Sequence, residues 1–185
     1  MSTLTKHRFT VADVYLMVDH GILPADQRIE LINGEIIDMS PINPPHASSV
    51  TKLDRFFSRH LSQDEYIIRV QNPVLLSDHS LPEADVTIAH YREALLEDEH
   101  PQASDIAILI EVADTTYRSD RNTKAPLYAA EGVPVYWIVN LNKRQVEVHT
   151  LPEAGKYTQV QVYQDDFAVL GATITPHDIF PLSKS

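Results

Sequence analysis

The stretch "DIAILIEVADTT" (residues 105–116) decides the fold. The apolar residues 106–110 predict a strand that is covered on both faces, which is typical of the centre of an α/β sheet. Glu111 continues this strand, although an unpaired ionised carboxylate is very costly in an apolar interior. The carboxylate must therefore be paired with a cation, protonated, or bound to a metal ion.

Periodicity and turn signals around this strand predict a mixed sheet with helices packed on it, in one α/β domain over residues 1–185. Thr10 and Asp13 resemble a capping box that begins a helix ending near Gly21, and Asn33-Gly34 is a favoured hairpin turn. A loop is expected at 41–46. Helices are expected at 47–61 and 127–132, and strands at 66–76, 84–90, 133–141, 145–151, 157–164 and 166–174. The last two strands are expected to pair as a final hairpin.

Composition limits the function classes. The 185 residues include 43% hydrophobic residues and no cysteine, so we expect a real core and neither disulfides nor thiolate chemistry. The net charge of −11 disfavours a broad phosphate-binding surface but suits a protein that binds metal cations. The sequence shows no secretory signal pattern and no apolar run long enough to span a bilayer, so a cytoplasmic protein without membrane contact is expected.

Four charged residues are candidates for chemistry. Asp85 begins one strand, Glu111 lies near the end of the central strand, Lys124 precedes a helix and Glu30 lies on the early hairpin. Two carboxylates on adjacent strands repel each other unless one is protonated or a cation lies between them. Oxygen ligands with an open face favour Mg²⁺ or Mn²⁺ over zinc, and a nearby ammonium would stabilise charge or orient a water.

Simpler explanations exist for the same residues. Glu111 would also be satisfied by an ion pair with Arg118, Arg121 or Lys124, and Asp85 would also suit a turn at the start of a strand. At this point both explanations stay open.

Six segments resemble the Uma-two family in content and order, between about Glu30 and His149. They are "IELINGEI", "SPINPPH", "RVQNPV", "PEADV", "IEVADTTYRSDRNTKAPLYAAEGVPVYWIVNL" and "VEVH", of which residues 111–141 form the most specific part. The resemblance implies a restriction-endonuclease-like fold of the PD-(D/E)xK class, a mixed β-sheet flanked by helices with an N-terminal helix and β-hairpin. It also implies an endonuclease that hydrolyses nucleic acid, with DNA as the expected substrate and Mg²⁺ or Mn²⁺ as cofactor.

The resemblance also implies roles for individual residues. Asp85 and Glu111 take the places of the acidic residues of the class and would bind the metal ion, with the backbone carbonyl of Val112 as a further ligand. Ala84 stands where the family usually has proline, which would loosen the turn and leave the site in place.

The lysine of the class departs from its usual position. Ala113 stands two residues after Glu111, and Lys124 matches the position to which the lysine has moved in this family. Glu30 matches an early glutamate that would reach the same site. Pro126 suits a first helical turn, so Lys124 is expected just outside the helix.

Other residues carry two interpretations each. His46 would be a general base or phosphate contact, or an exposed capping residue, and Gln71 would lie near the scissile phosphate or be a plain amide in the strand ladder. Asp120 suits a helix start, whereas Tyr128 and Trp137 suit the core. The histidines form no zinc motif.

The sequence therefore predicts a Mg²⁺-dependent endonuclease that uses Asp85, Glu111, Lys124 and Glu30, with His46 and Gln71 as accessory residues. A homodimer is expected, because one small catalytic site cuts one strand. Two alternatives stay open: a non-catalytic nucleic-acid or protein interaction module, and a hydrolase of small phosphoesters. The acidic composition suits both.

Overall fold

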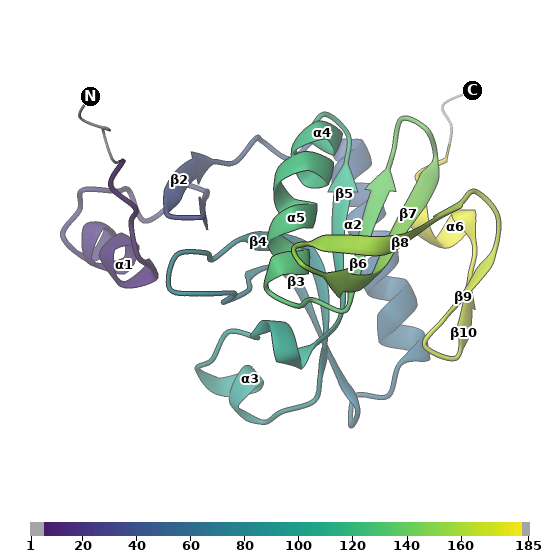
Figure 1. Ribbon diagram of the computed structural model, residues 1–185. Helices are drawn as coiled ribbons and strands as arrows, with labels where there is room; N and C mark the ends of the chain where they lie inside the picture. The colour runs from purple at the N-terminus through teal and green to yellow at the C-terminus, as the bar shows by residue number, and fades with distance from the viewer. Residues whose placement is uncertain (1–5, 183–185) are drawn as a thin grey trace.

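A six-stranded mixed sheet forms the centre of the computed structural model, which describes residues 6–182 (Figure 1). The strand order is β3-β4-β5-β6-β7-β8, and every neighbouring pair is antiparallel except β5 and β6, which are parallel. The strands span Tyr66–Pro73 (β3), Glu83–His90 (β4), Ile106–Ala113 (β5), Val135–Asn140 (β6), Gln145–Glu153 (β7) and Lys156–Tyr163 (β8). Every residue of β5 is buried, as its apolar sequence predicts.

Helices and two short hairpins surround this sheet. The helices span Val11–Asp19 (α1), Pro44–His60 (α2), Ala94–Glu97 (α3), Tyr117–Ser119 (α4), Ala125–Ala130 (α5) and Pro176–Ile179 (α6). A 3₁₀ turn (η1) covers Ala103–Asp105 and a π-helical segment (η2) covers Asp120–Lys124. The hairpins consist of β1 (Ile29–Ile32) with β2 (Glu35–Asp38), and β9 (Phe167–Val169) with β10 (Ala172–Ile174). The predicted mixed α/β fold is confirmed.

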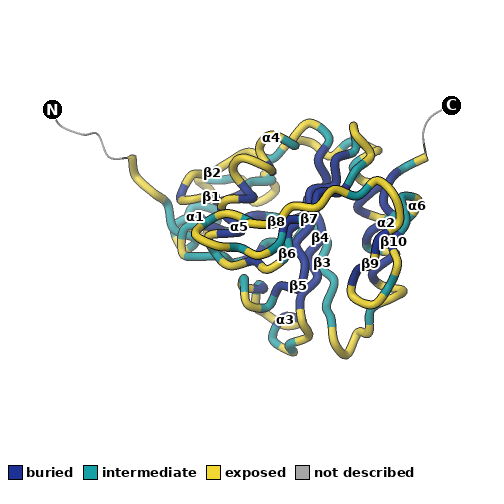
Figure 2. Tube along the Cα trace, turned by 45° about the vertical axis from the view of Figure 1, so that its right-hand side comes forward, coloured by how far each residue is buried: buried dark blue, intermediate teal, exposed yellow. Residues whose placement is uncertain are grey.

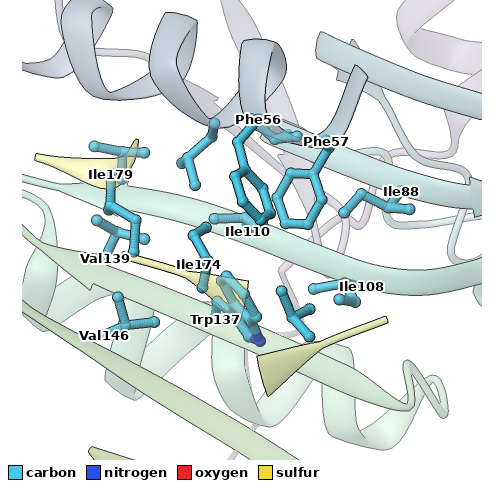
Figure 3. Close-up of a cluster of buried hydrophobic side chains, with 14 of the residues drawn as sticks. Phe56, Phe57, Ile88, Ile108, Ile110, Trp137, Val139, Val146, Ile174 and Ile179 are labelled. Carbon is cyan, nitrogen blue, oxygen red and sulfur yellow. The ribbon is translucent and has the colours of Figure 1, made fainter. Parts of the chain in front are cut away.

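The two faces of the sheet are covered by different helices. On one face, Phe56 and Phe57 of α2 pack over Ile110 and Trp137, with the Phe57 and Trp137 ring centroids 6.1 Å apart (Figure 3). On the other face, Tyr128 of α5 joins a second apolar cluster. Figure 2 shows the central strands β4, β5 and β6 as the buried interior between these layers, whereas β3 is half-buried and β8 is largely exposed. Burial of the apolar side chains stabilises the sheet at roughly 25 cal/mol per Å² of apolar area.

The N-terminal elements form as predicted. Thr10 and Asp13 make the reciprocal capping box of α1. Asn33 and Gly34 have φ angles of 52° and 79°, which are the positive values that a two-residue type I′ turn requires. Leu31 exchanges two backbone hydrogen bonds with Leu81, so the β1–β2 hairpin is fixed beside the segment that enters β4.

Two sequence expectations are wrong. Residues 157–164 and 166–174 do not pair with each other, because β8 pairs with β7 and β9 pairs with β10. Helix α2 begins within the loop expected at 41–46, because Asn43 caps it and Pro44 and Pro45 occupy the first turn, where proline is tolerated. In residues 6–182 no helix is long and apolar enough to cross a bilayer.

Candidate active site

The central strands β4 and β5 separate where their acidic residues lie. Their ladder ends at the pair Val86–Ile110, although both strands continue beyond it. Beyond that pair, the backbone N–H of Val112 donates to the side-chain Oδ2 of Asp85 at 2.8 Å in place of a ladder bond. Asp85 and Glu111 are the next residues of the two strands beyond that last pair, and both line the cavity at this opening.

A cavity of about 340 Å³ lies at this opening. Its walls include Asp85 of β4, Glu111 of β5, Glu30 of β1, Lys124 of η2 and His46 of α2. Five segments that are far apart in the sequence therefore bring their charged side chains to one place.

Lys124 lies inside this charge cluster and is only 7% exposed. Its Nζ donates to Oε1 of Glu30 at 2.7 Å and to Oε1 of Glu111 at 3.0 Å. The hydroxyl of Tyr128 donates to the same Glu111 oxygen at 2.8 Å. Lys124 takes the N-cap position of α5, just before the helix whose first turn contains Pro126, as expected. It also ends the π-helical segment η2, so residues 117–130 form one helical run. The π-helical segment lets the chain remain helical while the ammonium reaches the sheet.

The simpler explanation for Glu111 is therefore partly right. Its ion pair does form, with Lys124 as the partner, and this pair lies in the wall of the cavity. Arg121 instead approaches Glu147 of β7 at 3.5 Å. Tyr117 also donates to Glu147, at 2.6 Å, and this contact fixes the start of the helical run on β7.

His46 contacts the first acidic residue. Asn43 accepts the backbone N–H of His46 at 3.0 Å, so the cap is made by Asn43, and His46 is part-buried. Nε2 of His46 lies 3.0 Å from Oδ2 of Asp85. Its Nδ1 is buried and has no hydrogen-bond partner in residues 6–182. The imidazole thus orients the Asp85 carboxylate from the N-terminus of α2.

Several carboxylate oxygens in the cavity are left without a donor. Oδ1 of Asp85, Oε2 of Glu111 and Oε2 of Glu30 accept no hydrogen bond from any described residue, whereas the second oxygen of each carboxylate accepts at least two. The three free oxygens are not enclosed by protein either. They are acceptors that face the cavity.

Burial and crowding of charge perturb the pKa values. Burial, together with Asp85, Asp120 and Glu30, raises the pKa of Glu111 well above its ordinary value, and Lys124 opposes this rise. Burial lowers the pKa of Lys124, but its three carboxylate neighbours outweigh burial and raise that pKa. Lys124 is therefore an ammonium at neutral pH, and an additional cation near Glu111 would relieve the excess negative charge.

Asp120 is a cavity residue that sequence reasoning assigned to a helix start. It is 2% exposed, lines the cavity and accepts from the hydroxyl of Thr116 at 2.7 Å. Burial raises its pKa to about 6, against the opposing effects of Lys124 and Thr116. Asp120 is four residues before Lys124, and residues four apart share a helix face, so this spacing could have placed Asp120 beside Lys124 in the site.

Gln71 is not brought to the cavity wall. The ladder around it pairs Val70 with Val86 and Asn72 with Ala84, which places Gln71 across from Asp85. However, Gln71 has φ of 50°, and the ladder is interrupted at this position. Its accessory role stays a prediction.

The donor set fits a small divalent cation that keeps part of its water shell. Among residues 6–182, no three His, Cys, Asp or Glu side chains form a ready metal cage. Mg²⁺ typically binds one or two carboxylates and completes its shell with water and substrate phosphate, so Asp85 and Glu111 suffice. The side chain of Val112 belongs to the α2-side core cluster and the residue also lines the cavity, so its backbone carbonyl stays a predicted third ligand.

Comparisons with known proteins bear on this site. Residues 14–183 match the model of the Uma2 family, described as "Putative restriction endonuclease". A crystal structure of a "putative nuclease belonging to DUF820" from Anabaena variabilis ATCC 29413 superposes with a TM-score of 0.64 over 93% of this chain and 97% of that chain. The two sequences are 16% identical, so this likeness concerns the fold. No curated protein matches the sequence.

Proposed function

The chain belongs to the Uma2 family, and from this premise we propose that it is a metal-dependent endonuclease that hydrolyses phosphodiester bonds in DNA. One observation carries the proposal. Asp85 and Glu111 each present a donor-free oxygen to one cavity where β4 and β5 separate, beside the buried ammonium of Lys124. Carboxylates that face a cavity next to a fixed cation are the expected machinery of metal-assisted hydrolysis.

Asp85, Glu111 and the carbonyl of Val112 would hold Mg²⁺ or Mn²⁺. When bound, the cation supplies a Lewis acid for the phosphate and lowers the pKa of a coordinated water. The protein fixes the two carboxylates beforehand, because Val112 N–H and His46 hold Asp85 while Lys124 and Tyr128 hold Glu111. Such preorganisation reduces the reorganisation needed during reaction.

Lys124 would orient the attacking water and stabilise the negative charge that develops on the phosphoryl oxygens. It would not act as a general base, because its raised pKa keeps the amine protonated at neutral pH. Glu30 accepts from Lys124 and from the backbone N–H of Glu83, so it would hold the ammonium in place and tune the charge of the site. Its free oxygen would be a ligand for a second metal ion.

Two copies of the chain would act together on duplex DNA, because one cavity of this size serves one strand at a time. A second candidate activity, hydrolysis of small phosphoesters, is favoured by the net charge of −11 and the carboxylate-rich cavity, which oppose a polyanion. A third candidate, a non-catalytic interaction module, requires no metal.

Cleavage assays separate these candidates. Purified protein is incubated with plasmid, an oligonucleotide duplex and mononucleotides, with Mg²⁺, with Mn²⁺ and with EDTA. Metal-dependent cutting of plasmid and duplex supports the endonuclease. Turnover of mononucleotides alone would support the small phosphoesterase. The absence of turnover, with retained binding of nucleic acid or protein, would support the interaction module and overturn the proposal.

A further inference from the structure

The cavity contains more anionic than cationic side chains. Besides the carboxylates already described, Asp38, Glu83 and Asp114 lie in its wall. In the part of the chain that the structure describes, its lysines and arginines are Lys124 and Arg28. The carboxylates therefore repel a phosphodiester that enters this cavity. Binding of the phosphate then depends on the few cationic side chains that can offset this repulsion.

The ammonium of Lys124 is already paired with Glu30 and Glu111. Two carboxylates accept from its ammonium, and the side chain is 9% exposed. Arg28 is different, because its side chain is 36% exposed and forms one ion pair, from Nη2 to Glu83. Its Nε and Nη1 donate to no residue within 6–182 and are not enclosed by protein. A planar guanidinium with free donors is suited to bidentate contact with phosphate.

The hairpin directs Arg28 toward the cavity. Arg28 precedes β1 by one residue, and its carbonyl accepts from the N–H of Met39 at 3.0 Å, which continues the β1–β2 ladder. Residues two apart on a strand share a face, so Arg28 and Glu30 lie on the same side of the hairpin. Glu83 joins the two, because its carboxylate pairs with Arg28 and its backbone N–H donates to Glu30.

We infer that Arg28 is the residue that binds the substrate phosphate at the entrance of the cavity, exchanging Glu83 for the phosphodiester. The inference rests on the proposed function and adds a substrate-binding residue to it. Glu83 holds the guanidinium in position while the cavity is empty and competes with the phosphate when substrate arrives.

The two partners of this ion pair therefore have opposite effects. Arg28→Gln should weaken binding of a labelled DNA duplex roughly 10- to 100-fold, as expected for loss of a charge-assisted contact. It should also reduce the slope of log affinity against log salt by about one. Glu83→Gln should tighten binding, because it frees Arg28 and removes a negative charge. If the pair were merely structural, the two substitutions would have similar effects.

The experiment uses fluorescence anisotropy in Mg²⁺ on the Asp85→Asn background, so that the DNA stays intact, together with cleavage kinetics on the native background. Arg59→Gln is the matched control, since Arg59 is an exposed arginine in the last turn of α2 and outside the cavity. Weaker binding and a raised KM in Arg28→Gln, with Arg59→Gln unchanged, support the inference.

Unchanged affinity and salt slope in Arg28→Gln overturn the inference while leaving the endonuclease proposal intact, provided that the native protein cuts. If the native protein does not cut but Arg28→Gln still weakens binding, the endonuclease proposal fails and the phosphate contact stands. Absence of both cutting and DNA binding overturns both.

Discussion

Nζ of Lys124 lies 3.0 Å from Oε1 of Glu111, although one residue belongs to a π-helical segment and the other to the central strand. Burying either charged side chain here without its partner would destabilise the fold. The carboxylate would be buried without its counter-ion, and the ammonium would lose one of its two partners. The pair therefore links the packing of the helical run 117–130 to the geometry of the cavity.

Lys124→Met should destabilise the fold by about 3–5 kcal/mol, because it leaves Glu30 and Glu111 buried without their cation. Urea unfolding measures this loss. In the Glu111→Gln background Lys124→Met should lower the free energy of unfolding much less, because only one of the two buried carboxylates then remains without its cation. An equal cost in both backgrounds would show that the pair is not coupled.

Asp85→Asn and Glu111→Gln should each abolish Mg²⁺-dependent cleavage while the far-UV circular dichroism spectrum stays native, because each removes a carboxylate that is proposed to bind the metal ion. Glu147→Gln is the matched control, since Glu147 is equally buried but lies outside the cavity wall. It should lose stability and retain cleavage. Native rates in either cavity variant would refute the assigned roles.

Asp120→Asn should remove a pH-dependent destabilisation of the fold. The pKa of Asp120 is raised from 3.8 to about 6, so the folded state binds this proton more tightly than the unfolded state does. Ionisation of Asp120 therefore lowers the free energy of unfolding of the protein as pH rises from about 4 to about 6, by at most about 3 kcal/mol. The variant should match the native protein near pH 4 and be more stable at pH 7.5 in EDTA. An equal difference at both pH values would contradict this assignment.

Gly34→Ala should damage the hairpin that positions Glu30. Gly34 has φ of 79°, and a Cβ atom there would lie 2.7 Å from Cβ of Arg8. Gly21→Ala is the matched control, because φ is 68° but no other atom of residues 6–182 lies within 4 Å of the added one. The control should cost about 1 kcal/mol from backbone strain alone, and Gly34→Ala should cost clearly more. Thermal unfolding compares them, and equal losses would show that the hairpin tolerates the contact.

Much of the fold was predictable because local signals agree with the tertiary structure. The apolar run 106–110 forms the central strand, and Asn33-Gly34 forms the hairpin turn. The pairing of β8 was missed although Ala154 and Gly155, with φ of 48° and 74°, form the turn that joins it to β7. Gly155 was the signal for that turn.

The site was only partly predictable for a physical reason. The sequence predicted Asp85, Glu111, Lys124 and Glu30 as site residues, from their places on the predicted elements and from the family resemblance. The structure brings all four to one cavity. Their distances depend on where β4 and β5 separate and on a π-helical segment, neither of which has a local sequence signature. The contact of His46 with Asp85 joins residues 39 positions apart and likewise follows from tertiary packing.

The most direct test of the central claim is an anomalous difference map from a crystal of the native protein soaked in Mn²⁺. We expect a peak in the cavity within about 2.0–2.3 Å of carboxylate oxygens of Asp85 and Glu111. Loss of the peak in Asp85→Asn crystals would support the assignment. A cavity without a peak in crystals that bind Mn²⁺ elsewhere would contradict the claim that these two carboxylates form a metal site.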